Sequence, residues 1–260
     1  MYKYIEIGNS KIPTFTLCIA LGVCLGILVF FITSKRNKID KEYIDKLCVL
    51  IPFLFLGGIF GAMIFDKIAH WGETDAPWYK PGGISYSGGF ILGTICFLIS
   101  HMCIFKKGFK TALRDGELFI APLLIAHAFG RIGCFMGGCC YGKPSDSIFA
   151  VTFPEGSLQH QQYGYITPVL PTQLFEAAFL LILFGCMLLF IKKHRILIYL
   201  FAYGFFRFGI EFLRGDNRGN LSDVFSPSQL TSFIFIISAI ALLIYTIKKK
   251  PFDDETAKEL

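Results

Sequence analysis

Hydrophobic residues along this chain form seven long runs, separated by short stretches in which polar and charged residues gather. The runs cover residues 13–33, 47–69, 84–105, 118–136, 172–191, 196–212 and 229–247. Most are close to the ~20 residues that a helix needs to cross ~30 Å of hydrocarbon. None alternates with a period of two, and a lone segment in lipid must satisfy its own backbone hydrogen bonds. The pattern predicts an all-α polytopic membrane protein with seven transmembrane helices.

Composition supports this prediction. Hydrophobic residues make up 54% of the 260 residues, aromatic residues make up 16%, and the mean hydropathy is +0.57. These values lie outside the range of soluble globular proteins. The net charge of +6 comes from short basic blocks between apolar runs, which is typical of a topology signal rather than a nucleic-acid surface. We therefore expect no nucleic-acid partner.

The basic residues also predict an orientation. Sixteen of the 25 Lys and Arg residues lie in the connections 34–46, 106–117 and 192–195 and in the tail after residue 247, and six lie on the opposite side. Cytoplasmic loops carry the excess of Lys and Arg, so the N-terminus is predicted outside and the C-terminus in the cytoplasm. The first eleven residues are too polar for a signal peptide, and the first run is predicted as a retained span.

One membrane domain is predicted over residues 1–250, followed by a cytoplasmic tail, 251–260. The connection 137–170 on the outer face is the longest, and its composition around Thr152 and Phe153 predicts a short ribbon.

Charged residues within the predicted spans are candidates for function, because burying them in lipid costs a few kcal/mol. Arg207 and Glu211 are four residues apart on one helix and should pair, and Arg131 lies in another span. One interpretation is a structural ion pair that locks helices. The other is that two guanidiniums bind a phosphate of a phospholipid, for which their planar fork is suited.

Glycines cluster at two predicted helix ends. Gly82, Gly83, Gly88 and Gly89 bracket Ser85 and Ser87 at the start of one span, and Gly130, Gly133, Gly137, Gly138 and Gly142 close another. Close helix packing explains most membrane glycines, whereas exposed N–H groups at a helix start would bind an anion. Both interpretations stay open.

Six of the nine cysteines lie in or beside apolar runs, but Cys134, Cys139 and Cys140 gather at one span end. Their spacing matches no familiar zinc site, so no metal and no cofactor are expected. A disulfide of Cys134 with either neighbour, or a tight turn of small residues, remain the alternatives. His127, four residues before Arg131, is a candidate acid or base, and His101 is expected at the membrane interface.

Four segments together resemble the prolipoprotein diacylglyceryl transferases of bacteria. Residues 130–142 (GRIGCFMGGCCYG) are similar to the family signature Gly-Arg-x-Gly-Asn-Phe-x-Asn-x-Glu-x-x-Gly, and residues 82–89 are similar to its Gly-Gly-x-Ser-Phe-His-Gly-Gly. Residues 171–176 and 203–214 resemble Pro-Ser-Gln-Leu-Tyr-Glu and Tyr-Gly-x-x-Arg-Phe-x-x-Glu-Phe-x-Arg. The resemblance covers nearly the whole chain.

The resemblance implies transfer of the diacylglyceryl group of phosphatidylglycerol to the lipobox cysteine of a prolipoprotein signal peptide, with release of glycerol phosphate, in the bacterial plasma membrane. It assigns catalytic roles to Arg131, Arg207 and Glu211. The matching positions that imply substrate binding are Gly82, Gly83, Ser85, Ser87, Gly88, Gly130, Cys134, Cys139, Gly142, Gln173, Glu176, Tyr203 and Arg214. Membrane lipid is the environment from which the lipid substrate enters.

Several positions depart from the family pattern. Ser87 replaces the family histidine, Cys134 and Cys139 replace an asparagine and a glutamate, and Phe15 replaces a tyrosine. Both arginines remain, so the part of the site that would bind the phosphate resembles the family, and the part that would handle the acceptor thiol differs. Three alternatives to the family reaction follow: transfer to another nucleophile with Cys139 or Cys140 as a covalent relay, lipid binding without catalysis, and thiol oxidoreduction at the outer face.

Overall fold

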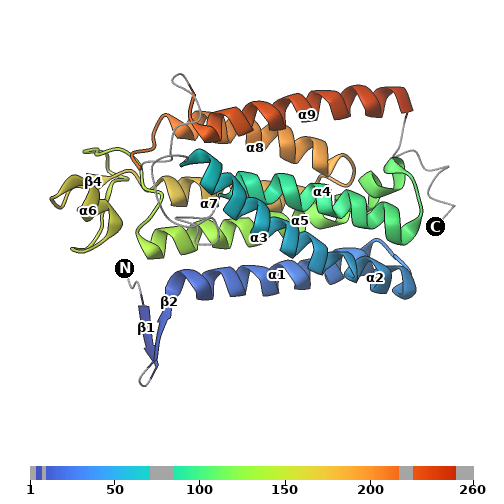
Figure 1. Cartoon of the computed structure of the whole chain (residues 1–260), viewed down its shortest axis with the longest axis horizontal. Coiled ribbons are helices and arrows are strands. Elements are labelled where there is room, and N and C mark those ends of the chain that lie inside the picture. Colours follow the sequence, from blue (N-terminus) through green and yellow to red (C-terminus); the bar gives the residue numbers. More distant parts are fainter. Residues whose placement is uncertain (1–3, 8–9, 71–84, 217–224, 250–260) are drawn as a thin grey trace. The chain divides into compact units, whose positions relative to one another are not determined.

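The computed structural model describes residues 4–7, 10–70, 85–216 and 225–249, and within them the chain is mainly helical (Figure 1). The helices are α1 (Thr14–Arg36), α2 (Lys41–Cys48), α3 (Leu50–Ala69), α4 (Tyr86–Phe105), α5 (Phe109–Gly137), α6 (Leu158–Tyr163), α7 (Thr172–Leu189), α8 (Arg195–Glu211) and α9 (Pro227–Lys249). Two small antiparallel sheets pair β1 (Tyr4–Ile7) with β2 (Ser10–Pro13), and β3 (Val151–Thr152) with β4 (Pro168–Val169).

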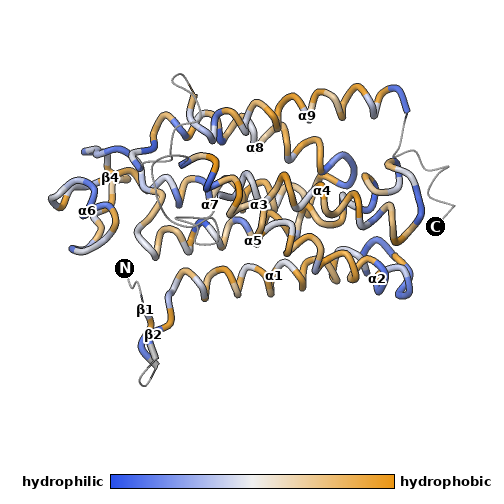
Figure 2. Tube along the Cα trace, viewed as in Figure 1, coloured by the Kyte–Doolittle hydropathy of each residue, from blue (hydrophilic) through white to orange (hydrophobic). Residues whose placement is uncertain are grey.

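Six helical segments among the described residues are long and apolar enough to cross a membrane. They are α1, α2 together with α3, α4, α5, α7 and α9. Figure 2 shows α1 and α9 as hydrophobic along most of their length, and α2 and α6 as largely hydrophilic. The chain is therefore a polytopic helical membrane protein. The remaining predicted run, 196–212, is also helical, as α8, but this helix has 17 residues and contains Arg207 and Glu211.

Three features were absent from the sequence prediction. The polar N-terminal segment forms the β1–β2 hairpin, and the basic connection after α1 contains the amphipathic helix α2. Asp40 caps α2 by accepting a hydrogen bond from the backbone N–H of Glu42 (2.9 Å). Helix α5 begins at Phe109, nine residues before the predicted span, because the polar residues that follow continue the helix. The predicted ribbon in 137–170 is confirmed as the pairing of β3 with β4.

The chain divides into two compact units. Unit 1 comprises Met1–Thr33, Leu118–Arg195 and Phe205–Asn217, and unit 2 comprises Ser34–Glu117, Ile196–Gly204 and Arg218–Leu260.

Aromatic contacts hold the helices of unit 1 together. Phe30 of α1 stacks on Phe119 of α5 with ring centroids 5.0 Å apart. Phe179 of α7 stacks on Phe206 of α8 at 4.1 Å, with the rings nearly parallel. Tyr141 forms a separate small core with Phe153 and Val169. Such pairs contribute roughly 0.5–1.5 kcal/mol beyond the area that they bury.

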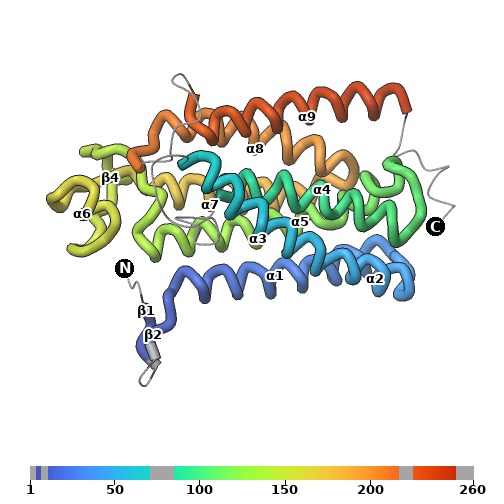
Figure 3. Tube along the Cα trace, viewed as in Figure 1, coloured from blue at the N-terminus to red at the C-terminus, as the bar shows by residue number. Residues whose placement is uncertain are grey.

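In unit 2, α3 and α4 run in opposite directions and pack closely (Figure 3). Gly61 faces Gly88, and a methyl group on either would overlap the backbone of the other helix. The side chain of His101 is completely buried, and its Nε2 lies 2.7 Å from Asp115 Oδ2, which also accepts a hydrogen bond from Tyr43. The depth of His101 in the membrane stays a prediction.

Candidate active site

Arg131 and Glu176 form a buried ion pair in unit 1. Arg131 lies on α5 and Glu176 on α7, and Nε of the arginine donates to Oε1 of the glutamate at 3.0 Å. Arg131 is 7% exposed and Glu176 is fully buried. His127, one turn before Arg131, places Nε2 3.7 Å from the same Oε1. A buried charge pair of this kind is stable only when its partners are well oriented.

The predicted pair of Arg207 with Glu211 is confirmed. Nη2 of Arg207 lies 2.8 Å from Oε2 of Glu211, both on α8, and both side chains are buried. Oε2 of Glu211 also lies 3.9 Å from Nε of Arg214, so one carboxylate faces two guanidiniums. Arg131 and Arg207 both lie within electrostatic range of His127. The two arginines that the sequence singled out therefore belong to one charged cluster.

Arg214, just after α8, is held by Asp216. Its Nε and Nη2 donate to the two carboxylate oxygens at 2.9 and 2.7 Å, which is the bidentate geometry typical of strong pairs. Burial alone would lower the pKa of Arg214, but Asp216 and then Cys140 raise it, and the net pKa lies above the ordinary value. Arg214 is thus charged at physiological pH. Its Nη1 is buried and donates no hydrogen bond to the described residues.

Cys134 and Cys139 are brought together by the way in which α5 ends. Gly138 adopts φ +72°, the left-handed conformation that favours glycine. The N–H of Gly138 bonds the carbonyl of Phe135 (3.2 Å), and the N–H of Cys139 bonds that of Cys134 (3.1 Å). These two bonds define a Schellman motif, in which the side chains at the positions of Cys134 and Cys139 commonly touch.

Cys140 joins them, because it too has a positive φ, +65°. The three Sγ atoms all lie within 4.8 Å of one another. None of the nine cysteines, all of which lie among the described residues, forms a disulfide, so the disulfide alternative is not seen. A non-glycine residue in this conformation costs roughly 1–2 kcal/mol and persists only where its surroundings impose it.

Helix α7 imposes that conformation. Gln173 Nε2 donates to the carbonyl of Cys139 at 2.6 Å, and Thr172 Oγ1 donates to that of Cys140 at 2.8 Å. Gln173 and Glu176 are one turn apart, and both are fully buried. The same face of α7 therefore orients Arg131 and fixes the thiol cluster (Cys134, Cys139 and Cys140).

The two predicted glycines of this region have different surroundings. The N–H of Gly142 donates to Leu170 at 2.8 Å, its backbone bridges Arg214, and a Cβ would lie 2.7 Å from the Leu170 carbonyl oxygen. Close backbone packing explains Gly142. A Cβ at Gly130 would meet no described atom within 4 Å, so packing does not require a glycine there.

Tyr141, between the thiol cluster and Gly142, is a hydrogen-bond donor. Its hydroxyl donates to Gln162 Oε1. Burial, with a smaller contribution from Asp216, raises the pKa of Tyr141 to about 12. The phenol is therefore neutral at physiological pH.

The predicted residues around the start of α4 belong to unit 2. Gly82 and Gly83 lie outside the described residues. The N–H of Ser85 donates a hydrogen bond to the carbonyl of Ala62 (3.2 Å), and Ser87 Oγ accepts one from Thr231 Oγ1 (3.0 Å). Tyr203 is buried and stacks on Tyr199. At Gly88 the packing interpretation is favoured, because this glycine is in direct contact with α3.

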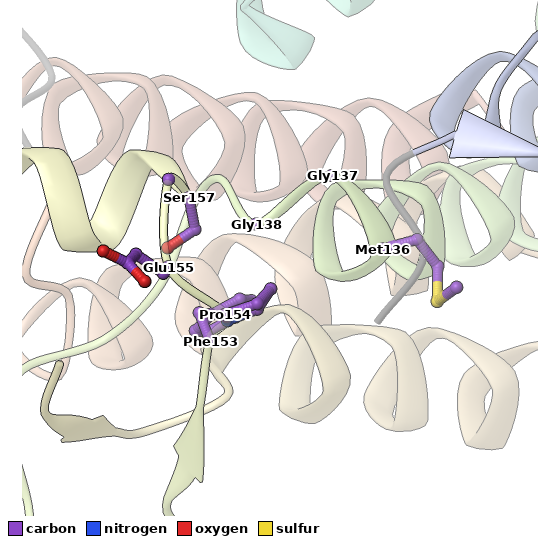
Figure 4. Close-up of a pocket in the computed structure, with 8 residues that line it drawn as sticks. Met136, Gly137, Gly138, Phe153, Pro154, Glu155 and Ser157 are labelled. Carbon is purple, nitrogen blue, oxygen red and sulfur yellow. The ribbon is translucent and has the colours of Figure 1, made fainter. Parts of the chain in front are cut away.

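A pocket of about 90 Å³ lies where α5 meets the loop before α6 (Figure 4). It is lined by Met136, Gly137, Gly138 and residues 153–157. Known ligand pockets measure about 300–1,000 Å³, so this space is too small for a diacylglycerol. It contains none of the residues that the sequence assigned to the site.

Comparison with known proteins places these features in a family. The model of the prolipoprotein diacylglyceryl transferase family matches residues 3–245. The chain is 30% identical over 264 residues to phosphatidylglycerol–prolipoprotein diacylglyceryl transferase 2 of Clostridium perfringens, with 98% of both chains covered. It is 29% identical to the enzyme of Clostridium tetani (94% and 96% covered) and 33% identical to that of Pseudoalteromonas translucida (75% and 73%). The chain therefore belongs to the prolipoprotein diacylglyceryl transferase family.

Proposed function

We propose that this chain transfers the diacylglyceryl group of phosphatidylglycerol to the lipobox cysteine of a prolipoprotein in the bacterial plasma membrane. The observation that carries the proposal is the buried charged cluster of unit 1, in which Arg131 and Arg207 are each oriented by a carboxylate. A membrane protein rarely keeps such groups unless they perform a task. The names of the relatives supply the two substrates.

The reaction explains why guanidiniums are needed. The acceptor sulfur attacks the glycerol carbon that bears the phosphate, a C–S bond forms, and the C–O bond breaks. The electron pair of that bond leaves with glycerol phosphate, which gains a negative charge. Arg131 and Arg207 bind this phosphate, and their attraction grows as the charge develops, which lowers the barrier.

The carboxylates position the arginines. Glu176 accepts from Nε of Arg131, which fixes the orientation of that guanidinium. Glu211 likewise binds one terminal nitrogen of Arg207. Because the guanidiniums are oriented before the lipid enters, little ordering is needed at the moment of reaction.

In the proposed topology seven helices cross the membrane, with α8 as the sixth in order, the N-terminus outside and the C-terminus cytoplasmic. The excess of basic residues on one side supports this orientation. The whole segment 1–250 acts as one transferase domain, since the family match runs through it almost completely. Phosphatidylglycerol enters sideways from the lipid, and the signal peptide presents its cysteine near the outer face.

The test uses purified protein in nanodiscs that contain phosphatidylglycerol, with a peptide that carries a lipobox cysteine. We expect release of glycerol phosphate and a peptide mass increased by one diacylglyceryl group. Release of glycerol phosphate without modification of the peptide would show that the acceptor is another nucleophile and not the lipobox cysteine. Absence of release in every lipid mixture would refute transferase activity and leave lipid binding.

A lipobox peptide with Ser in place of Cys is the matched control, and it should remain unmodified.

A further inference from the structure

The thiol cluster has the dimensions of a metal site. Zinc–sulfur bonds of ~2.3 Å hold thiolates about 3.8–4.0 Å apart in trigonal or tetrahedral geometry. The Sγ atoms of Cys134, Cys139 and Cys140 already lie within 4.8 Å of one another. Shifts of less than an ångström, within ordinary rotamer adjustment, would bring all three to bonding distance.

The backbone holds these thiols together at a cost. Cys140 keeps a left-handed conformation, and Gln173 and Thr172 fix the two carbonyls of the turn. Three small side chains that only filled space would not require this arrangement. The pre-organised turn favours a ligand that needs all three sulfur atoms.

A buried guanidinium and a buried amide oxygen lie near the thiol cluster. Arg214, buried and charged, lies within electrostatic range of Cys140. Three thiolates and a divalent zinc ion sum to one negative charge, which Arg214 offsets. Nη1 of Arg214 and Oε1 of Gln173 are both buried without a hydrogen-bond partner among the described residues. Gln173 is also the residue that anchors the carbonyl of Cys139.

The number of ligands points to a catalytic zinc ion. No fourth His, Cys, Asp or Glu of the described residues joins the group. Structural zinc sites use four protein ligands, whereas catalytic sites use three and leave one position open. Monovalent copper is satisfied by three thiolates and would leave no position for a reactant.

The position of the cluster fits the reaction. Cys134 follows Arg131 by three residues, so the two side chains lie on one face of α5. Arg214 lies within electrostatic range of both Arg131 and Cys140. The open position of a metal here would therefore lie beside the guanidiniums that bind the phosphate.

We propose that Cys134, Cys139 and Cys140 bind a zinc ion whose fourth position takes the acceptor thiol as a thiolate. This inference rests on the proposed function, and it replaces the expectation from spacing that the site holds no metal. On binding, the acceptor thiol releases its proton to solvent and forms a Zn–S bond. Its sulfur then attacks the glycerol carbon, the Zn–S and C–O bonds break, and thioether and glycerol phosphate are released. No oxidant or reductant is consumed.

The proposal also accounts for Ser87. A free thiol with a pKa near 8.5 is mostly protonated at neutral pH and needs deprotonation before it attacks. The family histidine is absent, and Ser87 is engaged with Thr231. Coordination to a metal deprotonates a thiol outright, so the thiol cluster would supply what a histidine base would otherwise supply.

The experiment measures metal binding directly. Protein in phosphatidylglycerol nanodiscs is stripped with a chelator under reducing conditions and titrated with zinc, and separately with cobalt(II), whose bonds to thiolates absorb in the near ultraviolet. We expect one ion per chain and thiolate-to-cobalt absorption. Adding the lipobox peptide should increase that absorption and change the visible bands, whereas a peptide with Ser for Cys should not.

Variants identify the ligands. Cys139→Ser and Cys140→Ser should each weaken zinc binding by at least the ~10–100-fold typical of losing even a supporting contact. Cys24→Ser, an exposed thiol of α1 outside the cluster, should bind zinc as the parent does. Should a cluster variant misfold, the cobalt spectrum and peptide response of the parent protein decide alone.

The outcomes separate this inference from the proposed function. Transfer to the peptide that proceeds in stripped protein, or a cluster that binds no zinc or carries a disulfide, overturns the zinc site and leaves the transferase. Saturation by copper(I) with no response to the peptide also overturns it. Zinc binding with a peptide response but no glycerol phosphate release supports the site and refutes the transferase.

Discussion

Glu176 illustrates how much depends on a single buried carboxylate. It is fully buried, accepts from Arg131 at 3.0 Å and lies 3.7 Å from His127. Replacing Glu176 with Ala would leave a buried guanidinium without its counter-charge. We expect Glu176→Ala to lower the free energy of unfolding by about 3–5 kcal/mol, the usual cost of breaking a buried pair. Thermal unfolding in detergent micelles measures this loss.

Glu155→Ala is the matched control, because the Glu155 side chain is exposed in the loop before α6. The midpoint of thermal unfolding of Glu155→Ala should equal that of the parent protein. A midpoint unchanged in Glu176→Ala as well would contradict the ion pair.

Arg207 separates the structural from the functional interpretation of the α8 pair. Lysine keeps the charge and still reaches Glu211, but it lacks the planar fork that binds a phosphate in two places. We expect Arg207→Lys to keep the unfolding midpoint and to lower kcat by about 10²–10³-fold, as for other lost transition-state donors. The rate of glycerol phosphate release measures kcat.

Arg36→Lys, at the exposed end of α1, should have the parental rate. A parental rate in Arg207→Lys would make the Arg207–Glu211 contact a structural pair only.

The sequence predicted residue contacts only where they are local. Arg207 and Glu211 are four apart on one helix, so helical geometry alone brings them together. Arg131 and Glu176 are 45 residues apart on two helices, and no spacing rule predicts their contact. Asp216 was missed although it lies two residues after Arg214, because a turn rather than a helix aligns the two.

At the scale of elements, the turn that ends α5 determines where the thiols lie. Gly138 at φ +72° closes the helix, and a Cβ there would lie 3.4 Å from the Phe153 ring. We expect Gly138→Ala to lower the free energy of unfolding by about 1–2 kcal/mol, the cost of a left-handed L-residue. Chemical denaturation followed by circular dichroism measures the change.

Gly185→Ala is the control within a helix. It lies in α7, where a Cβ would meet no described atom within 4 Å, and should stabilise the protein by about 0.5–1 kcal/mol. Equal stabilisation by both substitutions would contradict the positive φ of Gly138.

Element prediction succeeded where the pattern is long and failed where it is short. Runs of about 20 apolar residues identified the helices, and their ends agree within a few residues except at the start of α5. The β1–β2 hairpin has strands of four residues, too few for a periodic signal. The proximity of all three sulfur atoms could not be derived from their spacing, because a Schellman turn and a left-handed cysteine, not helical periodicity, bring them together.

At the scale of the whole molecule, α8 decides the topology. Its 17 residues rise about 26 Å at ~1.5 Å per residue, slightly less than the ~30 Å hydrocarbon thickness. If α8 crosses the membrane, seven crossings place the termini on opposite sides. If it does not, the six apolar spans place them on the same side.

We expect opposite sides, since short basic connections such as 192–195 precede α8 and orient it with its start in the cytoplasm. The measurement is protease protection of epitope tags at the two ends of the full chain in intact spheroplasts, with a soluble cytoplasmic protein as the control for integrity. The N-terminal tag should be removed and the C-terminal tag retained. Loss of both tags, or retention of both, would leave α8 inside the protein without crossing, and Arg207 would then have to reach the phosphate from a helix that enters and leaves on one face.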